Sequence, residues 1–477
     1  MTTAGVSACA GCDALMRLVE ELRGQLVDAR AETAMLKAKV ARLEKNSATS
    51  SKPPSSDFGK KSSGRKSKPK KSHGKRGGQP GHEPHFRDPF DDADVHYTDI
   101  ACAECPDCHG PVTPSTAPPK VIQQVDLLLP SEMISITGVR SHPVWCKKCK
   151  QVHYAAFDPA VTRAGLVGPR LTALVGYLKG ACHCSYTTIK RFVRDLFDIK
   201  ISRGQLAKVI AKVSDSIQGA YDDLAGRLPN EDLLNIDETG HKDYKTRMWT
   251  WCFRASLFTL FKIDPSRGSN VLLKTLGEDF DGLIGCDYFS AYRKYMKETG
   301  VLVQFCLAHF LRDVRFLVEH PHSKNRAYGQ RVLQQLRVLF NVIRDREEYT
   351  KKDFTMALQN AGDELSAEVV YRVPSTKEAQ NLAKRFHKHG ESYLRFITTP
   401  GLEPTNNLAE QAIRFVVIDR KITQGSRGET GQRWLERIWT AIATCAQSGR
   451  SVFTFLQESI AAFFQGAPTP KLLPDST

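Results

Sequence analysis

The sequence lacks any long uninterrupted run of apolar residues. No stretch approaches the ~18 consecutive apolar residues that a membrane-spanning helix needs. The opening MTTAGVSACAGC also lacks the basic and apolar regions of a secretory signal peptide. We therefore expect a cytosolic chain without a membrane partner. Its 13 cysteines would stay reduced there, so closely spaced cysteines are more typical of metal ligands than of disulfides.

Acidic residues are too few to balance the basic ones. The chain has 52 Asp and Glu against 68 Lys and Arg, which gives a formal net charge of +16 over 477 residues. An excess of this size indicates a polyanionic partner, and without a membrane segment the expected partner is nucleic acid. The length suits about three domains, at ~100–200 residues each.

The segment 13–45 predicts a leucine-zipper coiled coil, which implies a homodimer or higher oligomer. Apolar residues repeat every seven positions, with beta-branched residues favoured at one seam position and leucine at the other. The first seam position holds Val19, Leu26, Thr33 and Val40, and the second holds Leu15, Leu22, Ala29, Leu36 and Leu43. The alternative is an amphipathic helix that packs on the core of its own chain.

The composition changes abruptly to Ser, Lys, Gly and Pro over residues 46–94. Between Lys52 and Arg87, eight Lys and three Arg face two acidic residues. We expect a basic disordered linker, because this segment has too few apolar side chains to fold alone. Its charge suits contacts with DNA phosphates, although a plain solvated linker has the same composition.

Two Cys-x2-Cys pairs predict a zinc-finger-like module over 95–160. Two such pairs provide the four thiolates of a structural zinc site, here Cys105, Cys108, Cys146 and Cys149. Cys102 is a substitute ligand, and His109 or His153 is a further one. The alternating stretches 121–130 and 132–140 predict two strands of a hairpin that would bring the pairs together.

Residues 166–226 predict a helix-turn-helix-like helical region. Ser185 and Ser202 are placed to cap its second and third helices. The basic side chains expected to contact DNA there are Lys190, Arg191, Arg194 and Arg203. Many three-helix bundles bind no nucleic acid. The prediction that this region binds DNA therefore depends largely on the basic linker and the cysteine module beside it.

The pattern over 230–320 predicts a ribonuclease-H-like core, and the fold class expected for the whole chain is multidomain α/β. An apolar strand ends at Asp237, two hairpin-type strands and a helix follow, and a second short strand ends at Asp287. Basic helices over 321–400 would form a helical insertion. The segment 401–465 returns to the core with Glu410 in the first turns of a helix that Thr405 or Asn406 would cap.

Asp237, Asp287 and Glu410 together predict a site for Mg²⁺ or Mn²⁺. Carboxylate oxygens are the ligands that hard divalent cations prefer. Two such ions activate the attacking oxygen and stabilise the leaving oxygen in a displacement at phosphorus. Arg414, Arg420 and Arg427 would neutralise DNA phosphates near Glu410, although a solvated basic face has the same residues.

The motifs IDET, GCDYFSAY, CLAH and EPTNNLAEQAIR, together with GGQPGH in the basic linker, resemble the IS sixty-six type of bacterial insertion-sequence transposases. This resemblance covers nearly the whole chain. It implies an Asp-Asp-Glu transposase in which Asp237, Asp287 and Glu410 bind the catalytic metal ions. Cys306 and His309 match a Cys-x2-His element beside such cores, where they shape the active site or simply pack in the core.

The resemblance implies a DNA transposase that works in the bacterial cytosol, in association with the nucleoid. Its partners would be the terminal repeats of the transposon, target DNA and accessory proteins of the same element. Water would first cleave the transposon end, and the freed 3′-hydroxyl would then attack target DNA. Two other classes stay open: a transposase-derived DNA-binding regulator without catalysis, and a ribonuclease-H-like nuclease that cuts without strand transfer.

Overall fold

The computed structural model describes residues 10–45, 134–137, 139, 142–146, 151–154 and 156–473. The chain divides into a larger unit, residues 1–58, 139–195 and 199–477, and a smaller unit, residues 59–138 with 196–198. The predicted basic linker and much of the predicted zinc module lie outside the described residues. The account below therefore concerns mainly the larger unit.

Helix α1 spans Ala10–Leu43, which confirms the helical part of the prediction for 13–45. No proline interrupts this segment, and Gly24 has open space around it. The seam residues Leu22 and Leu36 are 53% and 55% exposed. The pairing of this seam with a second helix stays a prediction.

A two-stranded antiparallel hairpin consists of β1 (Pro143–Cys146) and β2 (Gln151–Tyr154), with Cys146 opposite Gln151. The strand that we predicted over 132–140 is wrong for the part that is described, because residues 134–137 have no regular secondary structure. Ile136 in that segment is 92% exposed, so its apolar alternation is not matched by a buried face.

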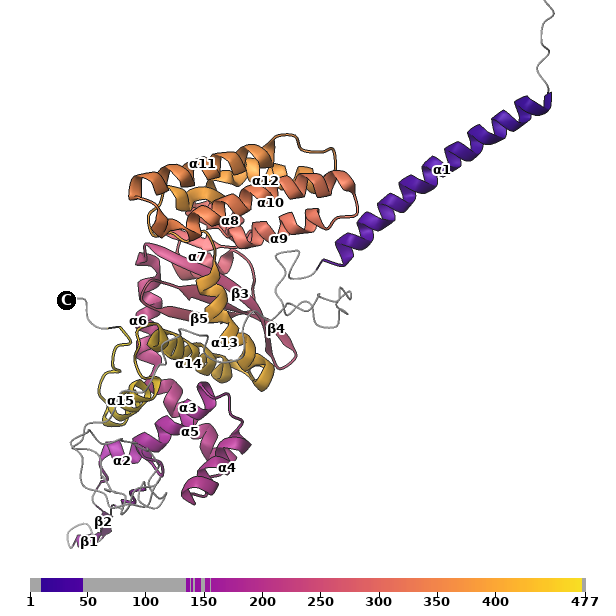
Figure 1. The fold of residues 1–477 in the computed structure, drawn as a ribbon. Helices are drawn as coiled ribbons and strands as arrows, with labels where there is room; N and C mark the ends of the chain where they lie inside the picture. Colours follow the sequence, from indigo (N-terminus) through magenta and orange to yellow (C-terminus); the bar gives the residue numbers. More distant parts are fainter. Residues whose placement is uncertain are drawn as a thin grey trace, which may run out of the picture. The chain divides into compact units, whose positions relative to one another are not determined.

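The centre of the fold is a five-stranded mixed sheet (Figure 1). Its strands are β3 (Leu233–Asp243), β4 (Thr246–Arg254), β5 (Thr259–Asp264), β6 (Leu283–Cys286) and β7 (Leu302–Phe305). Their order in the sheet is β5-β4-β3-β6-β7. Neighbours among β3, β4 and β5 run antiparallel, whereas β6 runs parallel to both β3 and β7. Helices α7 (Asn270–Leu276) and α8 (Ser290–Thr299) make the connections that β6 and β7 need.

Strand β3 is longer than the apolar run in its sequence. We predicted that the strand ends at Asp237, but the strand continues to Asp243. The polar residues after Asp237 stay extended because β4 pairs with them as far as the Asp243–Thr246 pair. Asp237 therefore lies in the middle of a long hairpin strand, and the hairpin extends beyond it.

Five helices precede the sheet and confirm the helical character of 166–226. They are α2 (Pro159–Ala164), α3 (Pro169–Gly180), α4 (Tyr186–Phe197), α5 (Arg203–Ser216) and α6 (Gln218–Arg227). The predicted caps are present: the Ser202 hydroxyl accepts a hydrogen bond from Gln205 N at 3.1 Å, and the Ser185 hydroxyl accepts one from Thr188 N at 3.0 Å. No helix in the described part of the chain is long and apolar enough to cross a membrane.

The remaining helices follow β7. They are α9 (Leu307–Val318), α10 (Ser323–Arg344), α11 (Lys351–Val370), α12 (Lys377–Leu394), α13 (Asn407–Thr423), α14 (Glu429–Gln447) and α15 (Val452–Gln465). Helix α10 packs on α9 and α11, and α11 packs on α12, which agrees with a helical insertion over 321–400 (Figure 1). Helix α13 packs along β3 and β4, and α14 packs on β5.

The helical region 166–226 is not separate from the rest of the larger unit. Helix α15 packs on α3 and α5, and α14 packs on α5. A Cβ atom on Gly180 would lie only 2.4 Å from Ile438 Cγ1, so the glycine allows α3 and α14 to approach closely. Buried side chains of all these helices join one hydrophobic cluster with those of the sheet.

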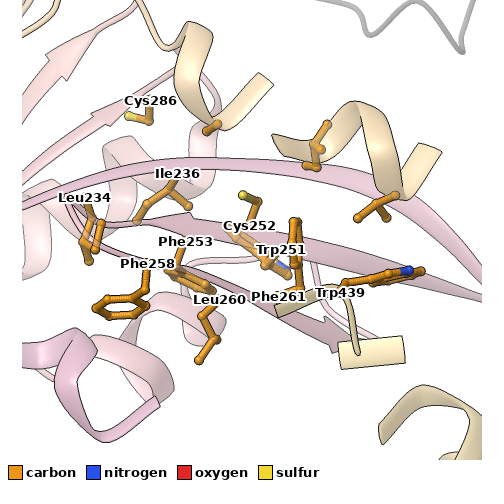
Figure 2. Packing of buried hydrophobic residues seen from close by; sticks show 14 of the residues in the cluster. Leu234, Ile236, Trp251, Cys252, Phe253, Phe258, Leu260, Phe261, Cys286 and Trp439 are labelled. Carbon is orange, nitrogen blue, oxygen red and sulfur yellow. The ribbon is translucent and has the colours of Figure 1, made fainter. Parts of the chain in front are cut away.

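Buried strand residues fill the core on both faces of the sheet (Figure 2). Ile236 of β3, Trp251 and Phe253 of β4 and Phe261 of β5 are fully buried. The Trp439 ring of α14 meets the Phe261 ring edge to face, with centroids 6.1 Å apart. This packing fixes the hairpin and α14 as one rigid support for the strand that carries Asp237.

Candidate active site

Three carboxylates come from three different elements. Asp237 lies within β3, Asp287 directly follows β6, and Glu410 lies in the first turn of α13. The parallel register pairs Asn235 with Gly285. Asp237 and Asp287 each lie two residues beyond that pair, so parallel pairing brings them to the same edge of the two strands. All three side chains keep part of their surface exposed. We call these residues the carboxylate cluster.

The carboxylate cluster is electrostatically strained without a cation. Burial is the main cause that raises the pKa of Asp237 well above its usual value, and the negative charge of Glu238 adds to it. Asp287 and Glu410 raise the pKa of Asp237 further. Burial also raises the pKa of Asp287 to about 7, again with Glu238 as the next contributor. Mutual repulsion of this kind is relieved by a bound cation or by protonation.

Glu238 is a fourth buried carboxylate that sequence analysis missed. The Tyr292 hydroxyl donates a hydrogen bond to its Oε2, and Arg267 Nη2 lies 2.7 Å from its Oε1. The Arg267 guanidinium in turn stacks over the Trp249 and Phe289 rings, 4.6 and 3.8 Å from their centroids. Both oxygens of Glu238 are thus engaged by protein groups, so it contributes charge to the site and holds Arg267. Its position next to Asp237 in IDET was the only signal in the sequence.

Asn406 joins the segments that carry the cluster. Its side-chain amide donates to Ile236 O at 2.7 Å, and its Oδ1 accepts from Asn235 Nδ2 at 3.0 Å. Its backbone N–H donates to Cys306 Sγ at 3.2 Å. We predicted Asn406 as a side-chain cap of the following helix. It does occupy that position, but its side chain makes no capping bond because β3 engages both of its polar atoms. The result is a fixed start for the helix turn that holds Glu410.

Cys306 and His309 lie beside Glu410. One donor atom from each of the three residues lies within 4.8 Å of the other two. His309 Nδ1 is 3.7 Å from Glu410 Oε1, and Arg312 Nη2 is 3.6 Å from Glu410 Oε2. Burial lowers the pKa of His309 to about 4, helped by Arg312, and burial raises the pKa of Cys306 to about 11. The imidazole and the thiol are therefore both neutral near pH 7.

Glu410 presents a free acceptor to the site. Its Oε1 is a buried atom without a hydrogen-bond partner among the described residues, and so is His309 Nδ1. A buried carboxylate oxygen without a donor is costly unless a ligand binds it. Glu410 therefore fits as a ligand of a divalent cation, because it offers a carboxylate oxygen to which no described residue donates a hydrogen bond.

The predicted DNA-contacting residues lie on two parts of the larger unit. Lys190, Arg191 and Arg194 are exposed on α4, and Arg203 is exposed at the start of α5. Arg194 forms an ion pair with its neighbour Asp195. None of these four residues belongs to the elements that carry the carboxylate cluster.

The basic residues that follow Glu410 lie nearer to the cluster in the fold. Arg414 is exposed one helical turn beyond Glu410 on α13. Arg427 lies in the connection between α13 and α14, where it lines a cavity together with Arg420. The structure therefore places both predicted arginines on the helix, or just beyond the helix, that supplies Glu410.

The predicted zinc ligands are not tested by the described residues. Cys105, Cys108 and Cys149 lie outside them, and the side chain of Cys146 does too. Cys146 ends β1, and the connection from β1 to β2 contains Cys149, so the second Cys-x2-Cys pair belongs to a hairpin. Zinc binding stays a prediction.

Comparisons with known proteins agree with this geometry. Residues 164–433 match the family model described as "Transposase IS66 family", which covers all of the sheet and the whole carboxylate cluster. Residues 9–88 match a second model, a family of unknown function (DUF6444). The chain is also 20% identical over 380 residues to "Uncharacterized protein y4qI" of Sinorhizobium fredii, across 73% of this chain and 69% of that protein.

The match over 164–433 defines the class of protein as a transposase. The chain belongs to the IS66 family, since that family's model covers more than half of its length. The resemblance stated from the sequence motifs is thereby confirmed.

Proposed function

We propose that this transposase binds the ends of its element and cleaves and joins DNA strands at the carboxylate cluster, with Mg²⁺ or Mn²⁺ bound by Asp237, Asp287 and Glu410. The observation that carries the proposal is the convergence of three carboxylates from β3, the end of β6 and α13 into one strained site. A solvated surface group has no such convergence. Glu410 has a protein cation close to one oxygen, with Arg312 Nη2 3.6 Å from Oε2, so Oε1 is the oxygen left for a metal ion.

The sheet supports a ribonuclease-H-like core. Three antiparallel strands are followed by two parallel strands that add on the other side of β3, in the order β5-β4-β3-β6-β7. This topology puts the first strand at the centre of the sheet, beside the strand that precedes the second Asp. The helical insertion between β7 and α13 then separates Glu410 from both Asp residues in sequence but not in space.

The donor set supports a hard divalent cation. Carboxylate oxygens suit Mg²⁺ and Mn²⁺, and Glu410 Oε1 has no protein donor among the described residues. Bound cations of this kind supply activation of the attacking oxygen and stabilisation of the leaving oxygen at phosphorus. The residues of the chain hold the ligands in place: Asn406 fixes the start of α13, and Arg267 neutralises Glu238 beside Asp237.

Strand cleavage and joining on the DNA of the element's own ends tests the proposal. Asp237→Asn and Asp287→Asn should each lower cleavage by at least about a hundredfold, because a metal-binding carboxylate supports several kcal/mol of transition-state stabilisation. Matched controls are Asp232→Asn and Asp281→Asn, since these exposed acids lie one residue before β3 and two residues before β6. Both controls should keep wild-type cleavage.

The outcomes separate the candidate functions. Cleavage that persists in both site variants contradicts the assignment of the carboxylate cluster. A wild-type protein that binds the end DNA with Mg²⁺ or Mn²⁺ but never cuts it, even with accessory proteins of the element present, is a DNA-binding regulator. Cleavage without any joined product on target DNA indicates a nuclease.

A further inference from the structure

A basic cavity lies at the far end of the β3–β4 hairpin from the carboxylate cluster. It has a volume of about 700 Å³ and opens between the hairpin turn and the connection from α13 to α14. Its basic lining residues are His241, Lys242, Lys245, Arg247, Arg420 and Arg427. We call this cavity the hairpin pocket. Neither the family matches nor the proposed function assigns a role to it.

The walls of the hairpin pocket are held by backbone hydrogen bonds. Ser426 N donates to Lys242 O at 2.9 Å, and Tyr244 N donates to Ser426 O at 3.1 Å. Gly425 adopts a φ of +91°, and a Cβ atom there would lie 2.2 Å from Lys242 O, so no other residue fits this turn. The pocket is therefore preformed, and a ligand does not have to order its walls.

The Asp243 carboxylate lies beside the pocket and is held by neutral donors. It accepts hydrogen bonds from the Ser426 hydroxyl at 2.9 Å and from Gly428 N at 2.7 Å. Within the described ranges, none of the five Lys and Arg residues that line the pocket forms an ion pair. Asp243 offsets part of their charge, and the five cations still leave the pocket positive.

Two lining residues have polar atoms turned into the protein. Arg420 is half-buried, with Nη1 donating to Thr239 Oγ1 at 3.2 Å. His241 is 2% exposed; its Nε2 lies 3.0 Å from the Ser426 hydroxyl, and its Nδ1 is buried without a partner among the described residues. A guanidinium that is partly removed from water gains more from an anion than an exposed one does.

The distance from the pocket to the carboxylate cluster follows from two independent elements. Lys242 lies five residues beyond Asp237 on β3, which is about 17 Å at the usual strand rise. Arg420 lies ten residues beyond Glu410 on α13, which is about 15 Å along a helix. The Arg420 guanidinium, however, reaches back to Thr239, which lies only two residues, or about 7 Å, beyond Asp237 on β3. The pocket therefore extends from about 7 to about 17 Å from the cluster.

We propose that the hairpin pocket binds a backbone phosphate of the DNA strand that the carboxylate cluster cuts. Phosphates on one strand of a duplex are about 3.4 Å apart along its axis, so the spacing corresponds to roughly two to five nucleotides from the scissile bond. The inference rests on the proposed function for its ligand. A phosphate held at this distance fixes the register of the strand without reading its sequence.

The first test measures binding of the end DNA at several salt concentrations, in EDTA so that cleavage does not interfere. Lys245→Gln with Arg427→Gln removes two exposed pocket cations and should reduce the slope of log K against log salt by about one, the change expected when the contact with one phosphate is lost. The matched control is Lys274→Gln with Lys297→Gln, which removes two exposed cations from α7 and α8. The control should keep the wild-type slope. Equal slopes for the two double variants would overturn the proposal.

The second test locates the phosphate. Neutral methylphosphonates replace the phosphates of the end DNA one at a time, and binding is compared between wild type and Arg420→Gln. One position, roughly two to five nucleotides from the cleavage point, should weaken wild-type binding several-fold and leave the variant unaffected, as a double-mutant cycle requires for a direct contact. Effects that add at every position would contradict the pocket contact. Pocket-dependent binding without metal-dependent cleavage would instead contradict the proposed function alone.

Discussion

Asn406 is the residue on which the geometry of the carboxylate cluster most depends. It is 2% exposed, and it links β3, the start of α9 and the start of α13 through three hydrogen bonds. Gly285 lies against the same contact, because a Cβ atom there would lie 2.4 Å from Asn235 Nδ2. A side chain at Gly285 would displace the amide that holds Asn406. The distance between Glu410 and the two Asp residues is therefore set by amides rather than by the acids themselves.

Asn406→Ala should reduce strand cleavage at least about tenfold while DNA binding stays unchanged, because Glu410 would lose its fixed position. Loss of the buried bonds should also lower the free energy of unfolding by about 1–3 kcal/mol. Both quantities are measured below the unfolding temperature of the variant, with Asn407→Ala as the control, since Asn407 is the exposed neighbour. Weaker DNA binding with unchanged turnover of the bound DNA would argue against a positioning role.

Single residues were predictable where the chemistry of the site demands one residue type. The two Asp residues and Glu410 were predicted from metal chemistry and apolar strands. In the structure, Asp287 and Glu410 both raise the pKa of Asp237, and their role as metal ligands stays a prediction. Glu238 and Asn406 were not predictable as site residues, because a Glu next to Asp237 and an Asn before a helix are common at the surface. Only the structure shows that Glu238 pairs with Arg267 and that the Asn406 side chain donates to Ile236 O.

Helix α14 covers the outer edge of the sheet with hydrogen-bond acceptors. The backbone N–H groups of alternate residues along the edge strand β5 donate to one α14 side chain per helical turn. These pairs are Thr259 N to Thr444 Oγ1 at 3.2 Å, Phe261 N to Thr440 Oγ1 at 3.0 Å, and Ile263 N to Glu436 Oε1 at 2.6 Å. Four helical residues advance about 6 Å and two strand residues advance about 6.6 Å, so the two repeats match over this length.

Thr440→Val should lower the free energy of unfolding by about 1–3 kcal/mol, because it keeps the shape of the side chain and leaves the buried Phe261 N–H without an acceptor. Urea unfolding measures the effect. Thr430→Val on the same helix is the control, since Thr430 is exposed and should change stability by less than about 0.5 kcal/mol. Equal stability of the two variants would show that the edge contact contributes nothing.

Elements were predictable as far as local patterns decide them. The strands β4, β5 and β6 and the helices of the insertion agree with the sequence pattern, and so do the caps at Ser185 and Ser202. The length of β3 was predicted wrongly, because pairing with β4 keeps its polar half extended. The partner of α14 was not predictable either, since threonines at a helical spacing carry no sign of the strand they contact.

At the scale of the molecule, α1 keeps an exposed apolar seam that a second copy would cover. Leu22→Lys with Leu36→Lys should shift the mass in sedimentation equilibrium from that of a dimer or higher oligomer toward that of the monomer, because charged seam residues disrupt a coiled coil. Val27→Lys with Met35→Lys is the control. These two residues lie off the seam and are 64% and 72% exposed. A seam variant that keeps the wild-type mass would show that other surfaces hold the oligomer together.

The division of the chain into domains was only partly predictable. The order of segments was predicted from changes in composition, and helices α10, α11 and α12 lie within the segment 321–400 that was predicted as a helical insertion. The helical region 166–226 was expected to stand apart, yet α14 and α15 from the end of the chain pack on α3 and α5. Contacts between segments this distant in sequence leave no periodic pattern in the sequence. The need for glycine at position 180 likewise becomes visible only in the structure, where Ile438 packs against it.

The hydrogen bonds between α14 and β5 also restrict how copies of the chain can assemble. At the opposite edge, backbone carbonyls of β7 are engaged by side chains: Val303 O accepts from Arg395 Nε at 3.4 Å, and Phe305 O accepts from Gln304 Nε2 at 2.9 Å. A strand from another molecule that approached either margin would find its pairing groups occupied. The sheet is therefore closed to growth by strand addition, so protomers that gather on two DNA ends must meet through helices, loops or the nucleic acid itself.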